Sequence, residues 1–223
     1  TGKATGISHV LYGRKETFHC SARITGQNPF LSLEFKVNKP FGKANKGITG
    51  NINTKLVGEY NFENILAALT IGLYFGVSPE KALQAIEAYE PSNSRSQLIE
   101  NKRNTILLDA YNANPTSMTA AITNFAAFGK APRAVLLGDM LEMGESSWDE
   151  HQQIVELLKK SQFELKILVG EEFMKTAFPQ SGFMSFGNSE EALAWLKENP
   201  LQGFHVLIKG SRGIRMEKTL EAL

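Results

Sequence analysis

Acidic and amide side chains follow a short apolar stretch near the middle of the chain. Thr105–Leu108 has the pattern of a buried strand, and Asp109, Asn112 and Asn114-Pro115 come directly after it. Asparagine followed by proline is typical of a helix start, because asparagine caps free N–H groups and proline fits the first helical position. A carboxylate can accept two hydroxyls such as those of a ribose, and free helix N–H groups bind anions. The stretch therefore predicts a nucleotide site, and a purely capping role for Asp109 and the asparagines is the alternative.

Two more apolar stretches end in polar turns that could act on the same ligand. Ala134–Leu137 runs into a turn with Asp139 and Glu142, and His205–Ile208 runs into Lys209-Gly210-Ser211-Arg212-Gly213. The carboxyl ends of parallel strands meet at one edge of a sheet, so the three turns would lie together. We therefore expect a ligand-binding site at that edge.

The second and third turns carry side chains suited to binding. Lys209, Arg212 and Arg215 can neutralise phosphate or carboxylate, and arginine can do so through two parallel hydrogen bonds. Gly210 and Gly213 allow positive φ and a close approach of the backbone. The acids of the second turn could orient an amine or a metal ion. Ordinary roles remain open, namely a solvated helix start for the arginines and helix capping for the acids.

Alternating strands and helices would position these turns. The pattern predicts strands at 105–108, 134–137, 166–169, 182–186 and 205–208, and helices at 115–128, 147–160, 171–177, 188–198 and 215–223. Parallel strands need crossover helices, so the repeated units imply an α/β fold with a parallel sheet and helices on both faces. Ser147-Trp148-Asp149-Glu150 has the pattern of a capping box at the start of one helix.

The first part of the chain has a different rhythm. In Leu31–Val37 apolar and polar residues alternate strictly, which predicts a half-buried strand, and other strands are expected near 9–12, 18–24 and 48–56. Helices are predicted at 62–75 and, after Ser78-Pro79, to about residue 89. The polar stretch Glu90–Ser96 contains proline and separates the two patterns. We therefore predict two domains, residues 1–90 and 91–223.

Composition excludes several classes of protein. Lys plus Arg number 24 and Asp plus Glu 23, so no basic field exists to hold a nucleic acid by its phosphates. The single cysteine, Cys20, cannot form an internal disulfide and fits a reducing compartment. No apolar run approaches the roughly 20 residues of a transmembrane helix, and no signal pattern is seen. We expect a soluble, cytoplasmic protein without nucleic-acid or membrane partners.

Two nucleotide-binding motifs are absent from the sequence. Neither the phosphate loop G-x-x-x-x-G-K-[ST] nor the dinucleotide fingerprint G-x-G-x-x-G occurs. A dinucleotide-dependent enzyme is therefore not expected. The histidines lack the spacing of metal ligands, and His151 is expected to lie solvated on a helix beside acids.

The three polar turns resemble, in the same order, three sequence blocks of the Mur ligase family. The blocks are Asp109–Pro115, Leu137–Glu145 and Lys209–Gly213. A fourth, Gly58–Asn64 followed by Ala67-Ala68, resembles the family block G-x-H-N-x-x-N-x-x-A-A, with Tyr60 in place of the usual histidine. The resemblance runs over essentially the whole chain, more loosely before residue 56.

The resemblance implies that the chain is a piece of a three-domain enzyme. Residues 1–90 would be the β-rich and helical end of its central ATPase domain, and residues 91–223 its Rossmann-like C-terminal domain. The phosphate loop and the metal ligands would lie upstream, so the chain alone would be inactive, with no catalytic residue and no metal ligand of its own. The branch with these blocks uses ATP and Mg²⁺ to join UDP-MurNAc-tripeptide to D-Ala-D-Ala through an acyl phosphate in peptidoglycan precursor synthesis. We expect a monomer.

The resemblance also implies roles for individual residues. Those on the nucleotide side would be Asn61, Asn64, Arg95, Asp109, Tyr111, Asn112 and Asn114. Those on the dipeptide side would be Asp139, Lys209, Ser211 and Arg212. Two other hypotheses stay open, a fragment of a folylpolyglutamate-synthase-type ligase and a non-catalytic nucleotide- or peptide-binding module. The Asp109–Pro115 block argues against the first, and tight ligand binding with no upstream reading frame would mark the second.

Overall fold

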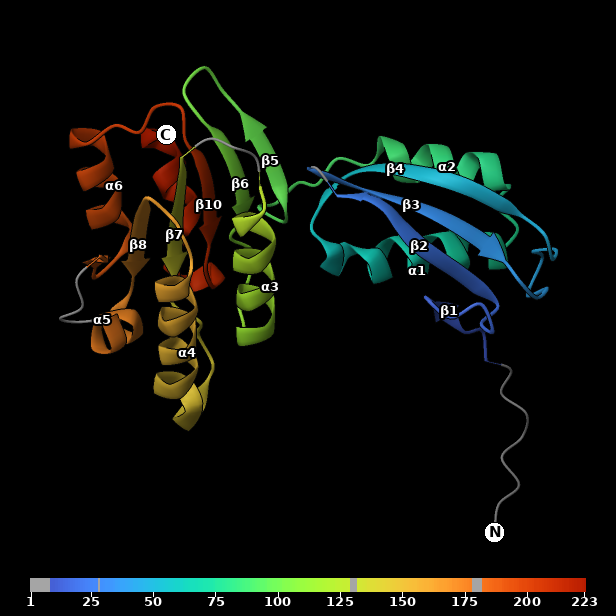
Figure 1. Cartoon of the computed structure of the whole chain (residues 1–223), viewed down its shortest axis with the longest axis horizontal. Helices are drawn as coiled ribbons and strands as arrows, with labels where there is room; N and C mark the ends of the chain where they lie inside the picture. The colour runs from blue at the N-terminus through green and yellow to red at the C-terminus, as the bar shows by residue number, and fades with distance from the viewer. Residues whose placement is uncertain (1–8, 28, 129–131, 178–181) are drawn as a thin grey trace, which may run out of the picture. The chain divides into compact units, whose positions relative to one another are not determined.

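The structure is a computed structural model that describes residues 9–27, 29–128, 132–177 and 182–223. The chain divides into two compact units, Thr1–Glu90 and Pro91–Leu223. Each unit contains its own β-sheet (Figure 1), and among the described residues the first sheet has four strands and the second has six.

The first unit is a small sheet with two helices. Its strands β1 (Tyr12–Gly13), β2 (Cys20–Gln27), β3 (Phe30–Val37) and β4 (Thr49–Val57) lie in chain order. The pairs β2/β3 and β3/β4 are antiparallel, whereas β1 runs parallel to β2. The predicted alternation in β3 is confirmed, since Leu31, Leu33, Phe35 and Val37 are all buried. The strand expected at 9–12 is wrong in extent, because strand β1 covers Tyr12–Gly13.

Helices α1 (Phe62–Tyr74) and α2 (Pro79–Ala88) close the core of the first unit, after the short 3₁₀ segment η1 (Glu59–Asn61). One face of α1 is buried at helical spacing, as the sequence predicts, and α2 adds Ala82 to the same apolar cluster. The Ser78 side chain caps α2 by accepting from the Lys81 N–H, and Pro79 takes the first helical position.

The second unit has a six-stranded sheet in the order β5-β6-β10-β7-β8-β9. Its strands are β5 (Gln97–Glu100), β6 (Thr105–Asp109), β7 (Arg133–Gly138), β8 (Leu165–Val169), β9 (Met184–Phe186) and β10 (His205–Lys209). All neighbours are parallel except β5, which runs antiparallel to β6. The parallel sheet is therefore confirmed, and its last strand in sequence lies between the strands that precede α3 and α4.

Helices cover both faces of this sheet, as predicted (Figure 1). On one face α4 (Ser147–Lys160) packs between α3 (Pro115–Ala126) and α5 (Glu171–Ala177). On the other, α6 (Ser189–Glu198) packs against the 3₁₀ segment η4 (Met216–Ala222). Val206 and Ile208 of β10 belong to the apolar cluster of this second face, with Ala192 and Leu196 of α6. Among the described residues, no helix combines the length and apolar character that crossing a bilayer requires.

Three details of the second unit differ from the predictions. Strand β5 was not expected, because Gln97–Glu100 shows no clear alternation and depends on its pairing with β6. The helix expected at 215–223 is instead η3 (Arg212–Ile214) and η4, separated by Arg215 at a φ of 58°. The capping box at Ser147 is also wrong, since that hydroxyl donates to the Glu172 carboxylate at 2.9 Å and makes no cap.

Candidate functional site

Asp109 ends β6 and lies at the edge of the sheet where the parallel strands terminate. Its Oδ2 accepts a hydrogen bond from the Lys209 ammonium at 2.6 Å, and its Oδ1 accepts from the Ser96 N–H at 3.0 Å. The side chain remains 14% exposed. Each carboxylate oxygen can accept more than one hydrogen bond, so the exposed side of Asp109 can still receive hydroxyl donors.

Lys209 pairs with Asp109 because β10 lies directly beside β6. The two residues occupy matched positions in the sheet, and the Lys209 side chain is only 2% exposed. Its ammonium also donates to the Asn112 carbonyl oxygen at 3.1 Å. Sequence reasoning placed Lys209 toward the dipeptide, but this geometry directs its charge to the turn that follows β6.

Two arginines flank the exposed ring of Tyr111 in the same turn. The guanidinium carbon lies 3.6 Å from the ring centroid for Arg95 and 5.4 Å for Arg212. All three side chains are exposed, Tyr111 by 37%. Stacking on an aromatic face leaves the N–H groups at the rim of a guanidinium free to bind phosphate or carboxylate oxygens. The structure thus brings Arg95, Tyr111 and Arg212, which are far apart in sequence, into one cluster.

The two asparagines of the β6 turn make local hydrogen bonds. Asn112 Oδ1 accepts from the Ala113 N–H at 2.9 Å. Asn114 Oδ1 accepts from the Ser117 N–H at 2.8 Å, and the Ser117 hydroxyl accepts in return from the Asn114 N–H, which completes a capping box on α3. The predicted cap with proline at the first helical position is confirmed. Both asparagines remain exposed at the site edge.

Asp139, after β7, turns its carboxylate into the protein. It accepts from the Glu172 and Phe173 N–H groups, each at 2.9 Å, and so caps the first turn of α5. Only 2% of the residue is exposed. Burial raises the pKa of the Asp139 carboxyl, and the two backbone donors offset that rise only in part. This geometry favours capping over the direct substrate contact that the sequence predicts.

His151 is the main residue that sequence reasoning misplaced. The expected solvated side chain is wholly buried in the structure. Its Nε2 accepts from the Met140 N–H at 3.0 Å, and its Nδ1 lies 2.7 Å from the Ser147 carbonyl oxygen, so the proton is on Nδ1. His151 therefore supports the turn after β7 through its hydrogen bond to the Met140 backbone. No sequence signal marks this role, because it depends on the approach of α4 to that turn.

Ser211 joins the three turns at the sheet edge. Its hydroxyl accepts from the Leu141 N–H at 2.9 Å and donates to the Ala113 carbonyl oxygen at 3.4 Å. At 3% exposure it is oriented into the protein, which favours a bracing role over the predicted substrate contact. Gly210 permits the close approach, since an added Cβ would lie 3.0 Å from the Gly138 Cα. The predicted close approach is confirmed at Gly210, whereas the predicted positive φ is not found there.

The two asparagines of the first unit hold the start of α1. Asn61 is buried, and its Nδ2 donates to the Val57 carbonyl oxygen at 2.9 Å. Its Oδ1 accepts from Asn64 Nδ2 at 3.3 Å, and Asn64 is exposed. Asn64 also lines an apolar cavity of about 420 Å³ within this unit. Among the described residues, no group of three or more His, Cys, Asp or Glu side chains could hold a metal ion.

The parallel sheet, with its polar turns on one edge, defines a Rossmann-like α/β domain of the ligand-binding class. Comparison with known proteins identifies the family. The sequence model described as "Mur ligase, glutamate ligase domain" matches residues 94–212, a little over half of the chain. The chain belongs to the Mur ligase family.

Individual relatives agree with this assignment. The UDP-N-acetylmuramoyl-tripeptide–D-alanyl-D-alanine ligase of Bacillus subtilis is 30% identical over 189 residues, which are 80% of this chain and 41% of that protein. The crystal structure of MurF from Acinetobacter baumannii is 25% identical with a TM-score of 0.80, covering 94% of this chain and 46% of that one. MurF from Thermotoga maritima, solved in complex with ADP, shares the fold at 19% identity and a TM-score of 0.74 over 96% of this chain and 47% of that one. The chain thus spans less than half the length of these relatives.

Proposed function

We propose that this chain is the C-terminal part of an ATP-dependent ligase that joins D-Ala-D-Ala to UDP-MurNAc-tripeptide. The observation that carries the proposal is that the family match, residues 94–212, includes the first two polar turns of one sheet edge and reaches Arg212 in the third. The name of the Bacillus subtilis relative supplies the substrates. Residues 1–90 would then be the end of the central ATPase domain, and residues 91–223 the C-terminal ligase domain.

The nucleotide would be bound through the turn after β6. Asp109 would accept the ribose hydroxyls on its exposed side, while Lys209 and the Ser96 N–H hold the carboxylate in place. Arg95, stacked on Tyr111, would bind phosphate oxygens. Arg212 lies 5.4 Å from the centroid of the same ring, so we propose that it also binds phosphate oxygens and not the dipeptide that the resemblance implies. Asn112 and Asn114 would lie near the ribose or phosphates, and Asn61 with Asn64 toward the adenine.

The proposed reaction has two steps. The terminal carboxylate of the tripeptide attacks the γ-phosphorus of ATP, which forms an acyl phosphate and releases ADP. The amine of D-Ala-D-Ala then attacks the acyl carbon, so that phosphate leaves and an amide forms. Mg²⁺, which neutralises charge on the phosphates, would be held by residues outside this chain. The phosphate loop would also lie outside this chain. We propose a cytoplasmic, monomeric enzyme.

The test uses the complete protein encoded by the gene, supplied with ATP, Mg²⁺ and UDP-MurNAc-tripeptide. ADP release and amide formation are measured with D-Ala-D-Ala as the amine and, in a separate reaction that contains a folate in place of the tripeptide, with glutamate as the amine. We expect product with D-Ala-D-Ala only, and no turnover by residues 1–223 alone. Product with glutamate would instead support a folylpolyglutamate-synthase-type ligase, and ligand binding without turnover of the complete protein would support a binding module.

A variant tests the nucleotide assignment. Asp109→Asn keeps the size of the side chain and should raise the KM for ATP roughly tenfold or more, because a charged acceptor of ribose hydroxyls is lost. Asp149→Asn, at an exposed position in the first turn of α4, is the matched control and should leave the KM unchanged. An Asp109→Asn enzyme with a normal KM for ATP would contradict the assignment.

A further inference from the structure

The β10 turn contacts the turns on both of its sides. Lys209 reaches the turn after β6, and Ser211 reaches both that turn and the one after β7. Strand β10 lies between β6 and β7 in the sheet, so its turn can bridge the two. The side chains of Lys209 and Ser211 are almost wholly buried, in contrast to the exposed Arg212 that follows.

We infer that Lys209 is a positioning residue for the nucleotide half of the site and does not bind the dipeptide. This inference rests on the proposed function and reassigns one residue within it. The ammonium donates to Asp109 Oδ2 at 2.6 Å and to the Asn112 carbonyl oxygen at 3.1 Å, with the Asp109 carbonyl oxygen at 3.5 Å. A lysine has three N–H donors, and these three acceptors account for all of them.

The contacts of Lys209 fix the direction of the Asp109 carboxylate. Lys209 holds Oδ2 while the Ser96 N–H holds Oδ1, so the carboxylate plane cannot rotate freely. The backbone of the same turn is held at Asn112, next to Tyr111. A ligand that binds Asp109 therefore meets an acceptor that is already oriented, and binding does not have to order it.

Ser211 extends the arrangement to the neighbouring turn. Its hydroxyl bridges the Ala113 carbonyl oxygen and the Leu141 N–H, and its own N–H donates to the Asp139 carbonyl oxygen at 3.0 Å. The turns after β6 and β7 are thus both tied to the turn after β10. Among the described residues, the Lys209 side chain donates hydrogen bonds only to the end of β6 and the turn after it, where the nucleotide would bind. Loss of this side chain should therefore change the KM for ATP and not the KM for the amine substrate.

The experiment compares Lys209→Met and Lys209→Arg with Lys218→Met in the complete ligase. Lys218 is the control because it lies in the same unit, is 33% exposed and pairs with Glu190 away from Asp109. We expect Lys209→Met to raise the KM for ATP about tenfold to a hundredfold, with the KM for D-Ala-D-Ala changed less than about twofold. Lys209→Arg keeps the charge and should show a smaller rise of the same kind. The control should match the wild type.

A double-mutant cycle separates positioning from a general loss of structure. If Lys209 acts through Asp109, Lys209→Met should add little to the KM for ATP once Asp109→Asn is present. If the two substitutions each raise the KM for ATP independently, so that their fold-changes multiply in the double variant, the inference is overturned. A rise in the KM for D-Ala-D-Ala alone would also overturn it. If Lys209→Met loses its thermal transition, the kinetics of Lys209→Arg decide by the same criteria. A wild-type enzyme without ligase activity would refute the proposed function itself, and the inference with it.

Discussion

Replacing Asp139 by alanine should destabilise the second unit by about 3 kcal/mol. The carboxylate is buried and accepts from two backbone N–H groups at the start of α5, those of Glu172 and Phe173. Each donor left without an acceptor in a buried setting costs about 1–3 kcal/mol. Removing a carboxylate that was costly to bury offsets part of this loss. Two such donors cost about 2–6 kcal/mol together, and the offset brings the expected loss to about 3 kcal/mol. That loss corresponds to a fall in Tm of roughly 10 °C for a unit of this size.

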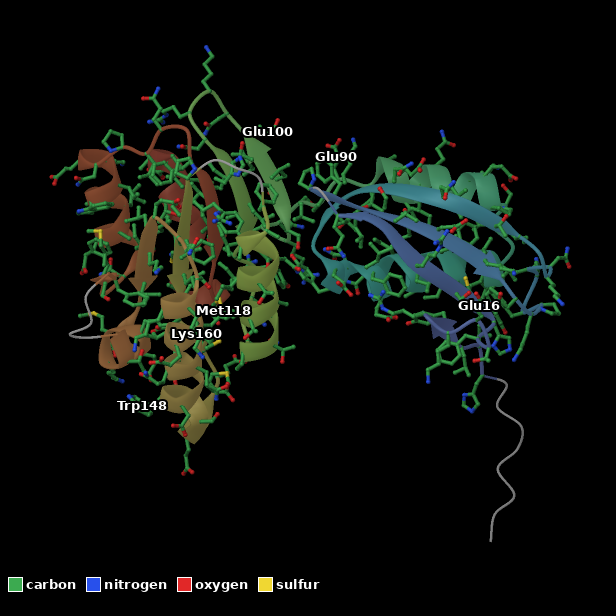
Figure 2. All side chains as sticks on the ribbon, in the orientation of Figure 1. Glu16, Glu90, Glu100, Met118, Trp148 and Lys160 are labelled. Atoms are coloured by element: carbon green, nitrogen blue, oxygen red, sulfur yellow. The ribbon has the colours of Figure 1, made fainter. Side chains whose placement is uncertain are left out.

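Fluorescence can follow this unit by itself. Both tryptophans, Trp148 and Trp195, lie in Pro91–Leu223, and Trp148 is exposed at the start of α4 (Figure 2). Urea unfolding of residues 1–223 monitored by tryptophan emission therefore reports on the second unit. Asp149→Ala is the control, because this exposed acid should contribute only about 0.3–1 kcal/mol through the helix dipole.

The result also decides between two roles for Asp139. The sequence predicts a substrate contact, which would leave the unfolding free energy of Asp139→Ala near that of the wild type. The structure places the carboxylate on α5 and predicts a large loss. Wild-type stability in Asp139→Ala would refute the capping argument, even if the variant enzyme had a raised KM for D-Ala-D-Ala.

Two further changes have definite expected results. Gly170→Ala should lower the unfolding free energy by at least about 2 kcal/mol in the same fluorescence assay, because Gly170 has a φ of 121° and an added Cβ would lie 2.2 Å from Asp139 Oδ2. At the control position Gly144 nothing lies within 4 Å of an added Cβ, so Gly144→Ala should cost about 1 kcal/mol, and equal losses in the two variants would refute the clash. Burial raises the pKa of the Cys20 thiol above its ordinary value of 9.0. As the pH rises, the thiol therefore ionises in the unfolded chain before it ionises in the folded one. The difference in unfolding free energy between the wild type and Cys20→Ala should be constant below pH 9 and fall above it, as measured by urea unfolding followed by circular dichroism. A constant difference up to pH 10.5 would count against a raised pKa.

Elements fixed by local interactions could be predicted from the sequence. The alternation of Leu31–Val37 identifies β3, because a period of two is enough to define a half-buried strand. Ser78, Asn114 and Asn188 were each expected to open a helix, and each accepts from N–H groups within its own first turn. These features need only three or four neighbouring residues, so no knowledge of the rest of the chain is required.

Features that depend on distant partners could not be predicted. Strand β5 exists through its pairing with β6, and nothing in Gln97–Glu100 alone defines it. His151 is buried because α4 brings it under Met140, although the residues beside it in sequence are polar. Arg215 adopts a left-handed backbone conformation that interrupts the expected C-terminal helix. Neither an arginine nor the residues around it in the sequence indicate such a conformation.

The strand order explains why similar polar residues at one edge have different roles. Lys209 ends β10 and Asp139 follows β7. Both strands have parallel neighbours on both sides, so other turns or helices surround the two residues and their polar atoms are used internally. Asp109 ends β6, whose outer neighbour β5 is antiparallel, so the N–H of Ser96, the residue before β5, lies there instead of a turn that follows a strand. Asp109 accordingly keeps 14% exposure, against 2% for Lys209. A polar residue after an interior strand is thus more suited to bracing, and one after the strand beside an antiparallel edge is more suited to binding.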